Sequence, residues 1–338
     1  MSIRFAFIGL DHWYNALPTL EALKQSPDAE VVALAHRDAA RADEIGRRYD
    51  VLVAPDYDAV IGRDDIDVVC VFTSADEVAQ VSIDALEAGN AVVAIKPMAM
   101  NLADADRVVE AARRSGGRYF PNDAARRFFP ANVQFKGWVE EGKIGDLLSA
   151  HCVFRAGLPR EWPDATTPGW FADPSRTPGG AFIDHAIYHV DLLRWLFGAE
   201  VESVTGMIAN VRHRDISVED YGHAVLRFAN GAMGSIEDTW TSGPGAPREA
   251  FEVVGSRGSL INDTATGRML LNGEFGLSGW IQTPAPALRS SFIGHVIRMM
   301  QGNEQAASGA EEARTNLAVC LAVYEAARSG GEVKLGVG

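Results

Sequence analysis

The chain has 338 residues, a length that corresponds to about two domains of roughly 150 residues each. Hydrophobic residues make up 47% and charged residues 22%, which is typical of a globular protein and too apolar for a disordered one. Acidic residues outnumber Lys and Arg by 45 to 31. The resulting formal net charge of −14 argues against a nucleic-acid partner and against docking on an anionic membrane.

The sequence also disfavours membrane insertion and secretion. No stretch of about 18 apolar residues is present, and the first residues resemble a strand rather than a signal peptide. The three cysteines, Cys70, Cys152 and Cys320, lie far apart without the spacing of a metal finger, so we expect free thiols. These features together predict a protein of the reducing cytoplasm.

Residues 1–120 alternate between strand and helix patterns. Strands are predicted at 3–8, 30–34, 67–72 and 91–95, and helices at 17–23, 39–49, 77–88 and 101–115. Two of the strands are continuous apolar runs, which is typical of strands covered on both faces. Repeated strand–helix units of this length predict an α/β domain with a doubly wound parallel sheet.

Residues 121–338 have a different pattern. Helices are predicted at 130–141, 181–197, 290–300 and 310–327, with a strand at 147–154 and a strand–turn–strand pattern over 201–261. Residues 156–180 are rich in Pro, Gly, Trp and Asp and form a predicted long loop, a kind of segment that is usually functional. This half is therefore predicted to be an α+β domain with a largely antiparallel sheet.

The strand that ends at Gly9 leads into a helix, which is the place of a dinucleotide-binding turn. Of the expected G-x-G-x-x-G only Gly9 is present, and Asp11 brings a carboxylate to the position where phosphates would lie. His12 can partly compensate by donating a hydrogen bond. The alternative is that this turn has lost its cofactor role.

Four further residues are candidates for cofactor contacts. His36 and Arg37 follow the second strand, where NAD enzymes usually carry an acidic residue for the ribose hydroxyls. Because a cationic pair suits a 2′-phosphate, this position favours NADP over NAD, unless Arg37 is only a solvated residue at the start of a helix. Thr73 and Ser74 follow the strand at 67–72, at the sheet edge where ligands bind.

Lys96 and Pro97 follow the next buried strand at the same edge. A lysine at the end of a buried strand is costly unless it has a partner. The helix predicted at 181–197 offers partners, because it carries five titratable groups within eight positions: Asp184, His185, Tyr188, His189 and Asp191. The glycine pair before this helix allows a ligand or another backbone to come close.

Three interpretations of this helix remain open. Asp184, His185 and Tyr188 can face a pocket and move a proton, since residues three or four apart share a helix face. His185 and His189 can instead form half of a metal site, although no third ligand is evident and we predict no metal. In the third interpretation both histidines only make core hydrogen bonds.

The order and spacing of several motifs give the chain a family resemblance along nearly its whole length. These are the strand–turn–helix at Gly9, then Ile95-Lys96-Pro97, Glu141-Gly142-Lys143-Ile144-Gly145, Gly179-Gly180-Ala181 with Asp184, Asp191-Leu192-Leu193-Arg194-Trp195-Leu196, Phe228-Ala229-Asn230-Gly231-Ala232 and Val254-Gly255-Ser256-Arg257-Gly258-Ser259-Leu260. The chain resembles the glucose-fructose oxidoreductase / inositol dehydrogenase / MocA (Gfo/Idh/MocA) family of NAD(P)-dependent oxidoreductases.

The resemblance implies an N-terminal Rossmann domain that binds NADP or NAD, and a C-terminal domain with an open sheet that commonly serves in oligomerisation. It therefore implies a homodimer or homotetramer, with a sugar, inositol or related polyol bound between the domains. The family's D-x-G-x-H-x-x-D becomes Asp184-x-Ala186-x-Tyr188-x-x-Asp191. Tyr188 therefore stands at the usual histidine position, which is similar to the branches in which a tyrosine pairs with the lysine.

On this basis we expect hydride transfer between nicotinamide and a secondary hydroxyl, with Tyr188 as acid/base. Lys96 is expected to lower the pKa of Tyr188 and to hold the substrate oxygen, and Asp184 to orient the hydroxyls. His185 and His189 are second choices for the proton role. Further substrate contacts are expected from Trp162, Trp170, Arg126 and Asn122. The net charge favours neutral sugars or polyols, and the alternative function is a non-catalytic or cofactor-retaining member of the same fold.

Overall fold

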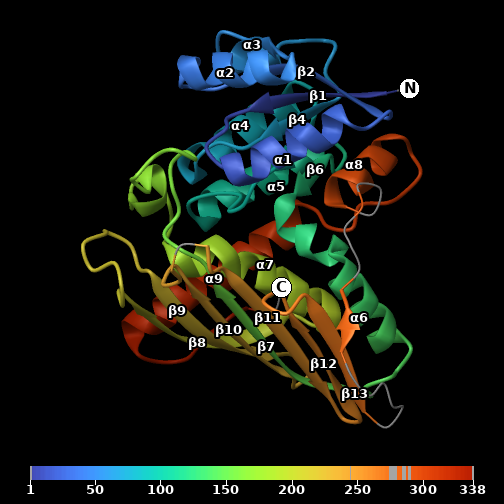
Figure 1. The fold of residues 1–338 in the computed structure, drawn as a ribbon, viewed down its shortest axis with the longest axis vertical. Helices are drawn as coiled ribbons and strands as arrows, with labels where there is room; N and C mark the ends of the chain where they lie inside the picture. Colours follow the sequence, from blue (N-terminus) through green and yellow to red (C-terminus); the bar gives the residue numbers. More distant parts are fainter. Residues whose placement is uncertain (1, 244, 274–279, 284–286, 288–290, 337–338) are drawn as a thin grey trace.

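A computed structural model describes residues 2–243, 245–273, 280–283, 287 and 291–336. The described chain forms two sheets, one in each half of the sequence, with helices between them (Figure 1). The predicted fold class is therefore confirmed. Cys70, Cys152 and Cys320 are buried and free, as the sequence indicates.

The first sheet has six parallel strands in the order β3-β2-β1-β4-β5-β6. Its strands are β1 (Ile3–Ile8), β2 (Ala29–Ala35), β3 (Leu52–Val53), β4 (Val68–Val71), β5 (Ala91–Ala94) and β6 (Tyr119–Pro121). Its helices are α1 (Trp13–Lys24), α2 (Ala39–Tyr49), α3 (Tyr57–Ile61), α4 (Ala75–Glu87) and α5 (Leu102–Arg114). The strand order reverses between β1 and β4, and ligands bind at such a switch point in open α/β sheets.

The turn after β1 is built around one glycine. Gly9 has φ +80°, and a Cβ there would lie 2.7 Å from the backbone nitrogen of Thr73 after β4. Only glycine allows this approach, because an L side chain rarely adopts that φ and would collide with the neighbouring strand end. Gly9 therefore allows the turn after β1 to pack directly against the end of β4, at the switch point of the sheet.

In the described residues, the second sheet has nine strands in the order β14-β13-β12-β11-β7-β10-β9-β8-β15, of which only β7 and β10 pair in parallel. The strands are β7 (Leu147–Arg155), β8 (Val201–Ala209), β9 (Tyr221–Phe228), β10 (Met233–Thr239), β11 (Arg248–Gly255), β12 (Gly258–Asp263), β13 (Arg268–Gly273), β14 (Ile281–Gln282) and β15 (Val333–Lys334). The helices of this half are α6 (Pro130–Glu140), α7 (Ala181–Phe197), α8 (Phe292–Met300) and α9 (Ala310–Ser329), with 3₁₀ turns η1 (Asn122–Phe128) and η2 (Gly169–Ala172).

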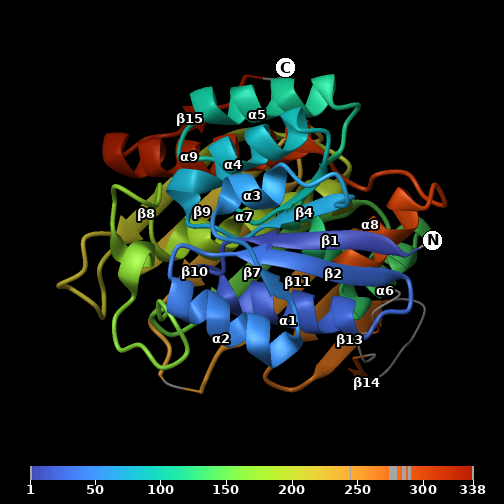
Figure 2. The ribbon, with the colours of Figure 1, turned by 90° about the horizontal axis from the view of Figure 1, so that it is seen from above.

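Helices α6, α7 and α9 lie on one face of this sheet, between it and the first domain, and no described helix covers the opposite face (Figure 1). Helix α9 also packs against α5 of the first domain (Figure 2). Arg113 and Glu311 form an ion pair of 2.9 Å across this junction, and Arg314 and Asp106 form one of 2.7 Å. The central helix α7 is thus held between the two domains.

The predicted strands and helices correspond closely to the observed ones, and α2 and α7 have the predicted bounds. The helix predicted at 290–300 starts at a residue outside the described ones and is observed as α8. Short elements, such as β3, β6 and β15, were not predicted. The division of the chain at residue 120 stays a prediction. In the described part of the chain, every helix is too short or too polar to cross a membrane.

Candidate active site

Lys96 and Asp184 form a buried ion pair where the two domains meet. Lys96 follows β5, and its Nζ donates to both the backbone oxygen and Oδ1 of Asp184 on α7. The side chain of Lys96 is 1% exposed and that of Asp184 10% exposed. The other carboxylate oxygen, Oδ2, accepts a hydrogen bond of 3.1 Å from the indole of Trp240. The structure therefore brings together two of the predicted catalytic residues.

The charge of Asp184 is stabilised by its neighbours. Burial alone would raise the pKa of Asp184, but His185 and the Lys96 ammonium outweigh it and hold that pKa well below the usual range. Asp184 is therefore a carboxylate at neutral pH, and its negative charge balances the buried ammonium. Such a pair can orient a hydroxyl group that enters beside it.

Tyr188 lies close to Lys96 but makes a different contact from the expected one. The Lys96 Nζ lies 5.4 Å from the centre of the Tyr188 ring, while the Tyr188 hydroxyl donates to Oδ1 of Asn122 at 3.0 Å. Burial, which outweighs the nearby Arg126, raises the pKa of Tyr188 above its usual value. The expected lowering of that pKa is thus wrong for this arrangement, because the ammonium faces the ring instead of the hydroxyl.

His189 is part of a buried charge network. Its Nδ1 lies 3.1 Å from Oδ2 of Asp238, its Nε2 lies 3.5 Å from Glu249, and Glu249 also pairs with Arg126. Burial opposes protonation, but the two carboxylates raise the pKa of His189 to about 9. An imidazolium held in this way cannot accept a proton at neutral pH, so the structure gives no support to His189 as a base. Arg126 is likewise occupied by Glu249.

A cavity of about 640 Å³ opens beside Asp184. Its lining includes Asp184, His185 and three aromatic side chains, Trp13, Tyr14 and Trp240. The ring of His185 stacks on Phe154, with ring centres 4.0 Å apart. Burial lowers the pKa of His185 to about 3, so this side chain is neutral at physiological pH and can serve as a hydrogen-bonding group.

The loop between β7 and α7 lies against the first domain (Figure 1). Trp162 stacks on His36 with ring centres 6.5 Å apart, and Arg41 lies 4.9 Å from the centre of the Trp162 ring. Trp170 lies against His12, with ring centres 4.7 Å apart. Neither tryptophan is among the residues that line the cavity at Asp184. Both cover the carboxyl edge of the first sheet, in place of the expected substrate contact.

Hydrogen bonds hold this loop to the same edge. Trp13 Nε1 donates to the backbone oxygen of Arg160 at 2.9 Å, and Arg176 Nη2 donates to Ser74 Oγ at 2.7 Å. Arg176 also forms an ion pair of 3.4 Å with Asp76 on α4. The loop thus connects the second domain to the turns after β1 and β4.

Several buried polar atoms at this edge have no partner in the described part of the chain. The amide of Leu10 donates to Nδ1 of His36 at 3.3 Å, so the proton of the neutral His36 ring lies on Nε2, which is buried and unpartnered. His12 Nε2 and Thr73 Oγ1 are also buried without partners. Because unsatisfied buried polar groups are costly, three of them at one sheet edge indicate that these residues fit a polar ligand such as a dinucleotide.

The acidic groups at this edge are partly neutralised. Burial, followed by the nearby Glu77, raises the pKa of Asp11 to about 6, and burial lowers the pKa of His36 to about 4. Arg37 forms an ion pair with Glu77 and its side chain is 68% exposed. The raised pKa makes Asp11 easier to protonate than an ordinary carboxyl group, but with a pKa of about 6 it is still mostly ionised at neutral pH.

A carboxylate fixes the start of α7. The backbone amides of Gly180 and Phe182 donate to Glu219 at 2.9 and 3.0 Å, and the hydroxyl of Tyr324 donates to the same carboxylate at 2.7 Å. A Cβ at Gly180 would lie 2.1 Å from the backbone oxygen of Glu219, and one at Gly179 would lie 2.1 Å from the Tyr324 hydroxyl. Because Gly179 and Gly180 have no side chains, Tyr324 and Glu219 can approach them closely. These contacts position α7, the helix that carries Asp184.

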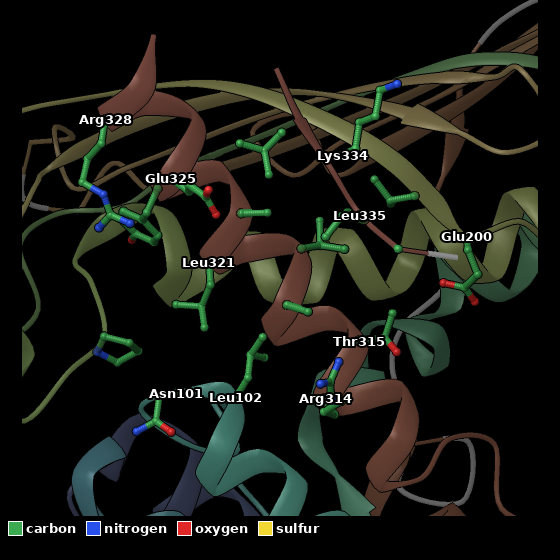
Figure 3. Close-up of a pocket in the computed structure, with 18 of the residues that line it drawn as sticks. Asn101, Leu102, Glu200, Arg314, Thr315, Leu321, Glu325, Arg328, Lys334 and Leu335 are labelled. Atoms are coloured by element: carbon green, nitrogen blue, oxygen red, sulfur yellow. The ribbon is translucent and has the colours of Figure 1, made fainter. Parts of the chain in front are cut away.

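Another cavity, of about 780 Å³, lies elsewhere, between α5, α9 and β15 (Figure 3). Leu102, Leu321 and Leu335 are among its lining residues, and none of the predicted site residues lines it. Within the described ranges, no group of three or more His, Cys, Asp and Glu residues is placed to hold a metal ion. His185 and His189 instead contact different neighbours.

Sequence reasoning missed Tyr14 and Glu219. Tyr14 follows the incomplete glycine motif, and its hydroxyl lies 2.9 Å from Nδ1 of His12. Its place in that motif was a usable signal, since a helix-start position near the switch point faces the ligand edge. Trp240 and Glu219 are distant in sequence from α7, and no local pattern places them beside it.

The comparisons with known proteins agree with this geometry. Residues 3–123 match the model of the oxidoreductase family with an NAD-binding Rossmann fold, and residues 133–261 match the GFO/IDH/MocA C-terminal domain. The chain belongs to the GFO/IDH/MocA family of oxidoreductases. The predicted family and enzyme class are thus confirmed.

Similar curated proteins include 1,5-anhydro-D-fructose reductase of Ensifer adhaerens, 27% identical over 91% of this chain and 92% of that protein. Inositol 2-dehydrogenase of Acidothermus cellulolyticus is 30% identical over 69% of this chain and 64% of that protein. Among solved structures, the WlbA dehydrogenase of Bordetella pertussis in complex with NADH and UDP-GlcNAcA has a TM-score of 0.83 at 25% identity and covers all of both chains.

Proposed function

We propose that this oxidoreductase transfers a hydride between a nicotinamide cofactor and a secondary hydroxyl of a sugar, inositol or related polyol. The observation that carries the proposal is the buried Lys96–Asp184 pair, which lies at the ligand edge of a Rossmann sheet and beside a cavity of suitable size. The named substrates of the relatives, an anhydrofructose and an inositol, belong to this chemical class.

The residues that would hold the cofactor surround the carboxyl edge of the first sheet. They are Gly9, Asp11, His12, His36, Arg37, Thr73, Ser74, Lys96 and Pro97. When bound, the nicotinamide supplies the hydride acceptor or donor. The unpartnered Nε2–H of His36 is suited to an oxygen atom of such a ligand, and His12 Nε2 is a further buried polar atom without a partner among the described residues.

The chain itself handles the proton and the substrate oxygen. Lys96 holds the reacting hydroxyl through its Nζ, and Asp184 orients that hydroxyl while balancing the ammonium. Tyr188 exchanges the proton, for which its hydroxyl must turn from Asn122 toward Lys96. In that position the nearby ammonium would lower the pKa of Tyr188 and ease proton transfer. His185 contributes a neutral hydrogen-bonding ring at the cavity wall.

A coupled assay tests the reaction and its residues. NAD and NADP reduction is measured over a panel of sugars, inositols and polyols, with wild type and the variants Lys96→Met and Tyr188→Phe. Wild type should reduce cofactor with at least one substrate, and each variant should lose about 100-fold or more of the rate. Activity of wild-type level in Lys96→Met would exclude the mechanism. If Tyr188→Phe keeps its activity while Lys96→Met loses it, Tyr14 would be the residue that exchanges the proton.

We further propose that the cofactor is NADP, because Arg37 is an exposed cation beside the place of the adenosine ribose. Its half-exposed ion pair with Glu77 is weak enough to be exchanged for a phosphate. Titration of NADPH and NADH against tryptophan fluorescence should show that Arg37→Ala weakens NADPH binding more than NADH binding. An equal loss for both cofactors would favour NAD as the natural cofactor.

A second candidate function is an enzyme that retains its cofactor between turnovers, or a non-catalytic binding protein. The loop that carries Trp162 and Trp170 favours retention, because it is bonded across the cofactor edge. The absorbance spectrum of the purified protein, before and after denaturation, tests this. Release of a dinucleotide only on denaturation supports retention, and failure of both cofactors to bind would favour the non-catalytic alternative.

We also propose that the uncovered face of the second sheet forms a homodimer or homotetramer interface, in a protein of the cytoplasm. On this face Met207 of β8 is 68% exposed and Val225 of the neighbouring strand β9 is 38% exposed. Exposed apolar side chains on a wide sheet favour association. Met207→Asp should shift the species seen in analytical ultracentrifugation toward the monomer, and an unchanged mass would contradict this interface.

A further inference from the structure

The cavity beside Asp184 has a positively charged rim. Arg160, Arg212 and His213 line it, and Asp184 is the only carboxylate among its described lining residues. Asp184 already pairs with Lys96, so its charge is balanced. The rim therefore carries an excess of positive charge in a chain whose formal net charge is −14.

The two arginines of the rim differ from others near the domain junction. Arg37, Arg126 and Arg176 each pair with a carboxylate. In contrast, Arg212 Nη1 donates to the backbone oxygens of Thr241 and Ser242 at 2.9 and 2.8 Å. Arg160 Nη1 donates only to a backbone oxygen, that of Pro163, at 3.3 Å.

The guanidinium groups of Arg160 and Arg212 have no carboxylate partner among the described residues, so both keep donors for another group. The backbone amide of Arg212 does donate to Oδ2 of the buried Asp220 at 2.8 Å. His213 adds a further polar atom, because its Nε2 is buried and has no partner in the described structure. Backbone oxygens fix the position of Arg212 without neutralising its charge. This arrangement is typical of a preformed anion site.

The cavity thus has three parts with different chemistry. Asp184, which pairs with Lys96, supplies a carboxylate, Tyr14 and Trp240 supply aromatic rings, and Arg160 and Arg212 supply positive charge. Aromatic rings suit the apolar face of a sugar ring. A volume of about 640 Å³ can hold a sugar together with a charged substituent.

We propose that the substrate is a sugar or polyol that carries an anionic group, a carboxylate or a phosphate, which binds to Arg160 and Arg212 at the rim of this cavity. The proposal rests on the proposed function and departs from the neutral substrate that the net charge favours. Net charge describes the whole surface, whereas selectivity depends on the potential inside one cavity.

Binding of matched sugars tests this, independently of turnover. Aldohexoses are compared as the neutral sugar, the 6-carboxylate and the 6-phosphate by isothermal titration calorimetry in the presence of NADP. At least one anionic form should bind about tenfold or more tightly than its neutral counterpart, and this preference should weaken as salt is raised. The preferred anionic form distinguishes a carboxylate site from a phosphate site.

The variant Arg160→Gln/Arg212→Gln should abolish the preference while neutral sugars bind as before. Arg214→Gln is the matched control, because Arg214 is an exposed arginine in the same segment that does not line the cavity. Urea unfolding verifies that the variants fold. No difference between anionic and neutral forms, including failure of both to bind, or a preference that survives the double variant, would overturn the proposal. Anion-selective binding without hydride transfer would support this site and refute the proposed function instead.

Discussion

Removing one member of the Lys96–Asp184 pair should strongly destabilise the protein. Lys96→Met leaves the Asp184 carboxylate, 10% exposed, with a hydrogen bond from the indole of Trp240 but without the ammonium that balances its charge. Breaking a buried ion pair in this way costs about 3–5 kcal/mol, because the remaining charge is no longer compensated. Asp184→Asn should be costly for the converse reason, since it leaves a buried ammonium.

The two substitutions should not be additive. In Lys96→Met/Asp184→Asn no charge remains, so the loss in the free energy of unfolding should be smaller than the sum of the single losses by about 2 kcal/mol or more. Urea unfolding followed by tryptophan fluorescence measures all four proteins. Arg107 and Asp104, an exposed pair, provide the control cycle, for which coupling below about 1 kcal/mol is expected.

The pH dependence adds a second readout. The pKa of Asp184 in the folded protein lies below its ordinary value of 3.8, so the pair stabilises the protein above that pH. This stabilisation is lost as the pH falls below 3.8, because protonation is then easier in the unfolded chain. Lys96→Met should remove this part of the acid sensitivity. Additive single losses, together with an unchanged acid profile, would refute an ion pair as the cause.

Three further outcomes are expected. The free energy of unfolding of the wild type should fall as the pH rises from 6.5 through about 9, because the pKa of His189 is raised in the folded state. In urea titrations, His189→Asn should reduce this loss by up to about 3 kcal/mol. Gly180→Ala should lower stability by about 1–3 kcal/mol and slow hydride transfer, whereas Gly137→Ala, which has open space around its Cβ, should leave both nearly unchanged in the same assays. Trp162→Ala should speed NADPH dissociation in stopped-flow fluorescence because it uncovers His36, and an unchanged rate would contradict the covering role of the loop.

Local patterns were sufficient to predict the fold. The alternation of apolar strands and helices along 1–120 predicts the parallel sheet, and the helix that carries Asp184 has clear periodicity. Very short strands such as Leu52–Val53 carry too few residues for any periodicity, and they form because an existing sheet edge pairs with them. Elements of this length depend on tertiary contacts rather than on their own sequence.

The site was predicted less completely, since side-chain partners depend on contacts between distant segments. The strand-end position of Lys96, the titratable groups of the helix around Asp184 and the family resemblance predicted both as site residues. They could not show that the Tyr188 hydroxyl would bind Asn122. His185 and His189 are four residues apart and look equivalent in sequence. The structure separates them, because one lies at the cavity and the other between two carboxylates.

The phenol of Tyr324 has a consequence for the minimal unit that can work as an enzyme. Its carboxylate partner Glu219 holds the start of the helix that carries Asp184, yet Tyr324 lies well beyond residue 261, where the matched C-terminal family segment ends. A chain truncated at residue 261 would keep Lys96 and Asp184 but lose this brace. We expect such a truncation to move Asp184 away from Lys96. Helix α9, which carries Tyr324, is therefore as necessary to the reaction as Lys96 and Asp184.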